Sequence, residues 1–193
     1  GLISLADKAL GFKLIGKLFN SLFVKVKGGN LGARLCKGAC HSAADKTACA
    51  RAYEKNLSIG HYFLPGAEEA VDALSKKYRL FLASNGTASV QQGRMTSANL
   101  YRFFEKVFVS QEIGFNKPSI HYFEGCFAQI PGFDKSKAII VGDSLTSDML
   151  GGQNAGIATC WVNPGHAPRK ENIRVDYEIE SLSQLEDLLE GLK

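Results

Sequence analysis

Short apolar runs alternate with amphipathic segments from about residue 61 to the end of the chain. Runs of strand length occur at 78–83, 107–109, 138–142, 158–162 and 175–179. Apolar residues at helical spacing predict helices at 67–77, 88–99, 118–130 and 182–192, with a further helix from Asp148. Strands that alternate with helices are typical of right-handed crossovers between parallel strands. The pattern therefore predicts an α/β fold with a doubly wound parallel sheet.

The first 24 residues show a different pattern, in which an apolar residue recurs about every four positions. These positions are Ile3, Ala6, Leu10, Leu14, Leu18 and Leu22, with Lys8 and Lys17 among the polar residues between them. The spacing predicts an amphipathic helix whose apolar face packs on the rest of the protein. A membrane-surface helix or a targeting peptide is also basic and amphipathic, so both stay open as alternatives. The Gly-rich stretch 25–38 is predicted to be a loop.

The composition is that of an ordinary globular chain. The 193 residues are 45% hydrophobic and 22% charged, which suits one domain with a sizeable core and at most a small appendage. Five cysteines, an odd number, favour reduced thiols, and we expect a cytoplasmic protein. Cys36, Cys40, His41 and Cys49 lie close together, but they lack a second paired ligand set and indicate a zinc site only weakly; ordinary buried or surface thiols are the favoured interpretation.

The net charge of +4 is unevenly distributed along the chain. Residues 1–50 contain eight Lys or Arg and two Asp, a net charge of +6, whereas the other 143 residues carry −2. A basic balance that arises at one end is weak support for nucleic-acid binding. No uncharged apolar run approaches the length of a membrane span. We therefore expect neither a nucleic acid nor a membrane as partner, although a basic surface for acidic partners or membranes stays open.

The segment 138–156 carries the first candidate chemistry. A short apolar strand stops at Asp143, and a second carboxylate follows at Asp148. Ligand sites of open α/β sheets lie at the carboxyl ends of the strands. Two carboxylates there can converge on one hard cation such as Mg²⁺, which prefers oxygen ligands. The alternative is a turn Asp followed by an Asp that favours the positive end of a helix.

Polar residues at two other positions suit a phosphate group. Ser84 ends the first predicted strand, and its hydroxyl and the backbone N–H of Asn85 can hold a phosphate oxygen. Gly86 lets the backbone approach an anion closely, although the same residues suit an ordinary turn before a helix. Lys117, where a loop meets a helix, can offset the charge of a phosphoryl group and a nearby carboxylate, or be one of many solvated lysines.

Three stretches of the sequence resemble motifs of one enzyme superfamily. They are LFLASNGT at 80–87, VFVSQEIGFNKPSIHYFE at 107–124 and AIIVGDSLTSDMLGGQNAGIATCWVNP at 138–164. They are similar to motifs two, three and four of the haloacid-dehalogenase (HAD) superfamily, in particular to its pyrimidine 5′-nucleotidase branch. The resemblance implies a Rossmann-like core with a helical cap inserted after the first strand.

The resemblance also implies a role for each candidate residue. Ser84 and Lys117 would be catalytic, since Ser84 would bind the transferring phosphoryl group and Lys117 would hold the phosphate and the nucleophile together. Asp143 and Asp148 would bind Mg²⁺ as the cofactor. The implied phosphate-binding residues are Ser84, Asn85, Gly86 and Lys117.

The first motif of the superfamily, D-x-D-x-T at the end of a strand, is absent from the sequence. In the superfamily its first Asp attacks phosphorus and its second acts as general acid and base. The Asp residues before the second motif are Asp7, Asp45 and Asp72, and none has another Asp two residues later. We therefore expect residues 1–60 to form part of a helical cap and residues 61–193 to form a core that lacks its first strand.

The expected function is that of a Mg²⁺-dependent phosphomonoesterase. It would hydrolyse a small-molecule phosphate ester, a pyrimidine nucleoside 5′-monophosphate, through an aspartyl-phosphate. Without the nucleophile strand, the 193 residues as written are expected to be inactive. Two alternatives stay open: a non-catalytic relative that binds phosphate or nucleotide, and another HAD phosphatase or dehalogenase.

Overall fold

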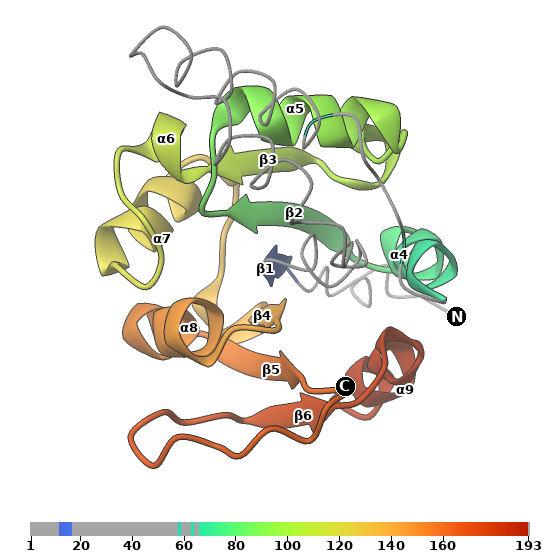
Figure 1. Cartoon of the computed structure of the whole chain (residues 1–193), viewed down its shortest axis with the longest axis vertical. Helices are drawn as coiled ribbons and strands as arrows, with labels where there is room; N and C mark the ends of the chain where they lie inside the picture. The colour runs from blue at the N-terminus through green and yellow to red at the C-terminus, as the bar shows by residue number, and fades with distance from the viewer. Residues whose placement is uncertain (1–11, 17–57, 59–62, 64–65, 193) are drawn as a thin grey trace, which may run out of the picture.

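The computed structural model describes residues 12–16, 58, 63 and 66–192. They form a six-stranded parallel sheet with the strand order β3-β2-β1-β4-β5-β6 (Figure 1). The strands are β1 (Phe12–Gly16), β2 (Arg79–Ser84), β3 (Lys106–Val109), β4 (Ala138–Gly142), β5 (Ala158–Val162) and β6 (Tyr177–Ile179). The α-helices are α4 (Ala67–Ser75), α5 (Ala88–Ser97), α6 (Ser110–Ile113), α7 (Ile120–Phe127), α8 (Leu150–Ala155) and α9 (Leu185–Glu190). The short turns of helix are η1 (Tyr101–Phe103), η2 (Lys135–Lys137), the π-helix η3 (Leu145–Met149) and η4 (Leu182–Gln184).

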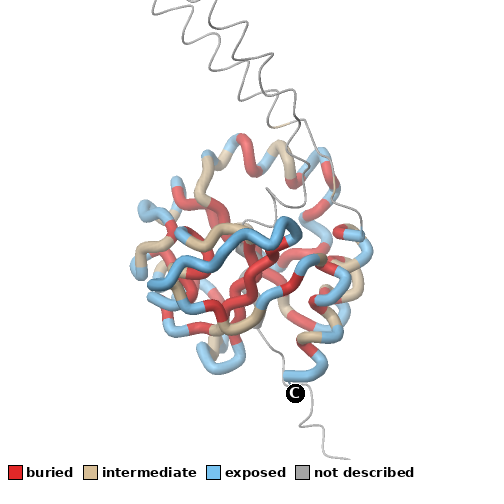
Figure 2. The backbone as a smooth tube through the Cα atoms, turned by 60° about the horizontal axis from the view of Figure 1, so that its bottom comes forward, coloured by how far each residue is buried: buried red, intermediate tan, exposed pale blue. Residues whose placement is uncertain are grey.

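Helices cover both faces of the sheet, because the strands carry apolar side chains on both. Leu80 and Leu82 of β2 belong to the apolar layer that packs under α4 and α9. Phe81 and Ala83 belong to the layer under α7 and α8 (Figure 1). Buried residues fill the interior, and exposed residues lie in the loops and on the outer sides of the helices (Figure 2). The predicted α/β fold with a doubly wound parallel sheet is therefore confirmed.

The strand β1 lies in the middle of the sheet and corrects two predictions. Its residues pair with β2 on one side, up to Gly16 opposite Ala83, and with β4 on the other. The helix predicted over residues 1–24 is therefore wrong for Phe12–Gly16. The core also has a strand in the central position that we expected to be missing. The physical reason is that β2 and β4 present facing edges of backbone N–H and C=O groups, which a strand between them satisfies.

Several predictions for the amino-terminal part lie outside the described residues. They are the rest of the helical cap expected at 1–60, the loop at 25–38 and the group of Cys36, Cys40, His41 and Cys49. Within the part that the structure describes, no helix has the length and apolar character needed to cross a membrane.

Candidate active site

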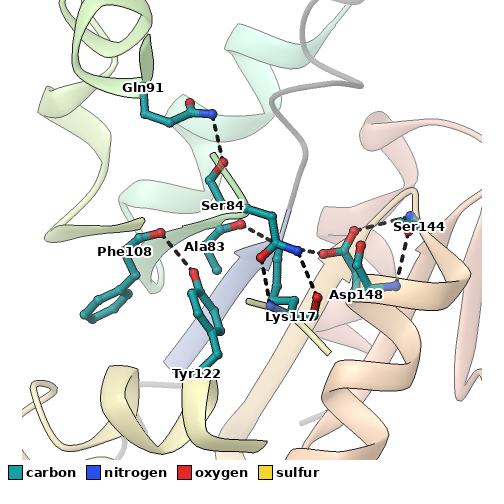
Figure 3. A network of polar contacts seen from close by, with 10 residues as sticks. Ala83, Ser84, Gln91, Phe108, Lys117, Tyr122, Ser144 and Asp148 are labelled. Carbon is teal, nitrogen blue, oxygen red and sulfur yellow. Dashed lines mark hydrogen bonds and ion pairs between the residues drawn. The ribbon is translucent and has the colours of Figure 1, made fainter. Parts of the chain in front are cut away.

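The predicted site residues gather at the carboxyl edge of the sheet. Ser84 is the last residue of β2, and Asp143 directly follows β4. Lys117 comes from the loop between α6 and α7, and its ammonium group reaches the backbone oxygen of Ala83 at the end of β2 (Figure 3). Asp148 lies in η3 and meets Lys117 there. Residues far apart in the sequence are thus brought together because parallel strands end at one edge.

A buried ion pair between Lys117 and Asp148 forms the centre of the site. Lys117 Nζ lies 2.6 Å from Asp148 Oδ1, and both side chains are completely buried. Lys117 Nζ also donates to Ala83 O at 2.7 Å, while Asp148 Oδ2 accepts from the backbone N–H of Ser144 at 3.3 Å. Buried charges are tolerated when they are paired and hydrogen-bonded, as both are here. The pair fixes the position of the lysine with respect to β2.

The side chain of Asn85 holds the loop that carries Lys117. Asn85 Nδ2 donates to Lys117 O at 2.9 Å, and Asn85 Oδ1 accepts from the Lys117 backbone N–H at 2.8 Å. Both polar ends of this side chain are therefore committed to the backbone of one residue. For a phosphate, Asn85 can offer its backbone N–H and the second N–H of Nδ2.

Ser84 has a partner that the sequence analysis missed. Its hydroxyl oxygen accepts from Gln91 Nε2 at 2.8 Å, and both side chains are buried (Figure 3). Gly86 makes room for this contact, because a Cβ atom there would lie 3.1 Å from Gln91 Nε2. The sequence contained a partial signal: Gln91 lies four residues before Met95 and hence on the same face of the predicted helix, which indicates burial but not the partner.

Asp143 and Asp148 do not have equal roles in this geometry. Asp148 is bound to Lys117 and Ser144, whereas Asp143 is only partly buried and uses its backbone oxygen to accept from Trp161 Nε1 at 3.0 Å. Among the described residues, no group of three or more His, Cys, Asp or Glu side chains is arranged to hold a metal. Mg²⁺ needs only one or two protein carboxylates beside water and phosphate oxygens. Asp143 fits that limited donor set.

The thiol beside the site is unsuited to nucleophilic attack. Cys126 lies on α7 and is completely buried. Burial raises the pKa of the Cys126 thiol to about 12. The thiolate is the nucleophilic form of cysteine, so a thiol with this pKa stays neutral and inert near neutral pH.

The sequence of the chain is similar to the sequences of known hydrolases. The family model of haloacid dehalogenase-like hydrolases matches residues 20–162. HAD-hydrolase YfnB of Bacillus subtilis is 38% identical over 146 residues, which cover 76% of this chain and 62% of that protein. Pyrimidine 5′-nucleotidase PynA of Streptococcus pneumoniae is 37% identical over 147 residues, again 76% of this chain and 62% of that protein. The chain thus spans about three fifths of the length of these curated relatives.

The fold is also similar to a solved structure of one of these relatives. The crystal structure of YfnB, described as bound to magnesium, aligns with a TM-score of 0.74 and 35% identity. The alignment covers 82% of this chain and 69% of that one.

Proposed function

The chain belongs to the haloacid dehalogenase-like hydrolases, and on this premise we propose that its site binds a pyrimidine nucleoside 5′-monophosphate together with Mg²⁺. The observation that carries the proposal is the donor count of Lys117. An ammonium group has three N–H donors, and two of them meet Ala83 O and Asp148. The third has no acceptor among the described residues, and an oxygen of a phosphoryl group suits it.

The other residues have complementary tasks in this proposal. The hydroxyl of Ser84 and the backbone N–H groups of Asn85 and Gly86 donate to phosphoryl oxygens. Asp143 holds Mg²⁺, which supplies positive charge to the phosphoryl group when it is bound. The pyrimidine part of the proposal rests on the similarity to PynA.

Turnover is a separate question, because family hydrolysis needs a carboxylate nucleophile. The strand β1 pairs with β2 and β4, which is the place that the resemblance gives to the nucleophile strand. Its sequence, FKLIG, contains no Asp or Glu. This observation favours the second candidate function, a member that binds the nucleotide without hydrolysing it.

We predict that the 193-residue chain binds UMP but does not release phosphate from it. Loss of a nucleophile commonly lowers turnover by several orders of magnitude, roughly 10⁴-fold or more. The measurement compares phosphate release from UMP and dUMP with Mg²⁺ between the chain and its Asp143→Asn variant, beside UMP binding by ³¹P NMR. Robust turnover that is lost in Asp143→Asn would contradict non-catalytic binding and support the phosphomonoesterase. Absence of any UMP binding would contradict the proposal as a whole.

We also predict weak Mg²⁺ binding that depends on Asp143. A site to which one carboxylate contributes leaves most of the ion's ligands to water, so we expect saturation only at roughly millimolar Mg²⁺. Calorimetric titration should show binding by the chain and none by Asp143→Asn. Asp72→Asn, which removes a carboxylate from the surface of α4, is the control and should bind like the parent. Sub-micromolar binding that survives Asp143→Asn would show that the cation lies elsewhere.

A further inference from the structure

We propose that Gln91 is a positioning residue that turns the Ser84 hydroxyl proton toward the phosphoryl group. The inference rests on the proposed function, because the direction of this proton matters only if an acceptor enters the site. The contact joins the first turn of α5 to the end of β2, with Gln91 Nε2 2.8 Å from Ser84 Oγ (Figure 3). Gln91 is 6% exposed and Ser84 is 2% exposed, so water competes little for either group.

The direction follows from the donor and acceptor capacity of a hydroxyl. Serine has one O–H donor and two lone pairs that accept. The amide N–H of Gln91 occupies one lone pair of Ser84, which leaves the O–H bond free to point elsewhere. Among the described residues, no hydrogen bond has the Ser84 hydroxyl as its donor. Its proton is therefore available to an oxygen that arrives at the carboxyl edge of β2.

The local geometry is built around this contact. A side chain at position 86 would crowd it, since a Cβ there would lie 3.1 Å from Gln91 Nε2 and 3.5 Å from Ser84 Oγ. Within the described part of the chain, Gln91 Oε1 is buried and has no hydrogen-bond partner. Burying an unsatisfied carbonyl is unfavourable, so packing alone gives no reason for glutamine at this position. Orientation of Ser84 gives one.

The decisive test uses the Gln91→Glu variant, in which the orientation of the Ser84 hydroxyl proton should depend on pH. When it is protonated, the new carboxyl group can donate to Ser84 as the amide does, whereas a carboxylate can only accept, which draws the hydroxyl proton away and repels phosphate. Burial keeps a carboxyl protonated to higher pH than usual. Relative to the parent at each pH, the variant should bind inorganic phosphate with similar affinity near about pH 5 and about tenfold or more weakly near about pH 8. Binding is followed by ³¹P NMR with Mg²⁺ present.

Two variants serve as controls for this test. Gln92→Glu adds the same charge one residue further along α5, on an exposed position, and should show no such pH-dependent ratio. Gln91→Leu removes the donor and should weaken phosphate binding by a factor that does not change with pH. A Gln91→Glu ratio that stays constant with pH, or that Gln92→Glu reproduces, would overturn the inference. Thermal unfolding of each variant tests whether the fold is retained.

A measurement without ligand separates this inference from the proposed function. The side-chain amide resonances of Gln91, assigned by their loss in Gln91→Leu, should shift in Ser84→Ala because the acceptor is removed. No shift would overturn the inference even if phosphate binds. If the resonances shift in Ser84→Ala but the parent does not bind phosphate, the contact between Gln91 and Ser84 exists and the proposed function is wrong. The proposed role of the Ser84 hydroxyl proton is then wrong as well.

Discussion

Replacement of Lys117 by Met should lower the free energy of unfolding by about 3–5 kcal/mol, since it leaves a buried carboxylate without its cation. The carboxylate is Asp148, which has no solvent exposure to compensate for the loss. Asp148→Asn should be destabilising for the converse reason, because it leaves a buried ammonium group. Urea unfolding at neutral pH measures both effects.

The double variant Lys117→Met, Asp148→Leu separates stability from binding. Removal of both charges avoids the unpaired ion, so the double variant should be more stable than either single change. Phosphate binding should not return, because the lysine donor is gone. Lys76→Met is the control, since its pair with Asp72 is exposed and worth about 1 kcal/mol or less. A loss for Lys117→Met no larger than that of Lys76→Met would contradict the central role of the buried pair.

Gly142→Ala should weaken the ion pair between Lys117 and Asp148 by displacing Asp148. A Cβ atom at the end of β4 would lie 2.6 Å from Asp148 Cγ, so the carboxylate has to move away from Lys117. Overpacking of this kind typically costs about 1–3 kcal/mol, and phosphate binding should weaken with it. In combination with Lys117→Met, the losses of stability should be less than additive, because both changes break one contact.

Gly165→Ala is the matched control for this prediction. No heavy atom lies within 4 Å of a Cβ at position 165, which belongs to the loop after β5. Its free energy of unfolding and phosphate affinity should equal those of the parent. If Gly142→Ala proved as harmless as Gly165→Ala, the close packing of β4 against Asp148 would be of no consequence.

The strands β2 to β5 were predictable as short, mostly apolar runs between polar turns, and β6 as a segment in which apolar and acidic residues alternate. The sequence pattern failed for β1, whose FKLIG segment lies within a longer stretch of helical period. The period of apolar residues depends on one segment alone, whereas β1 is stabilised by hydrogen bonds to β2 and β4, which are distant in the sequence. The local pattern contains no information on these long-range pairings.

The sequence predicted which residues gather at the carboxyl edge of the sheet, but not the hydrogen bonds and the ion pair between them. Ser84 was identified at the end of an apolar run, Lys117 where a loop meets a helix, and Asp148 as the second carboxylate after a strand. A carboxylate near Lys117 was expected, but mutual distances depend on the register of the sheet, so the sequence did not identify Asp148, 31 residues away, as the partner. Gln91 was missed because one polar residue in a helix gives no sign of which neighbour it meets.

The central place of β1 also affects the order in which the chain can fold. Phe12 pairs with Ala138, more than a hundred residues later, so this half of the sheet cannot form until β4 has been synthesised. Pairings of such long sequence separation raise the contact order and slow folding, since a large loop must close before they form. During translation β1 leaves the ribosome well before β4. Until β4 follows, the backbone N–H and C=O groups on the edge of β1 that pairs with β4 have no strand partner. The pairing of β1 with β4 joins the two halves of the sheet. This step is therefore expected to be late and to limit the folding rate.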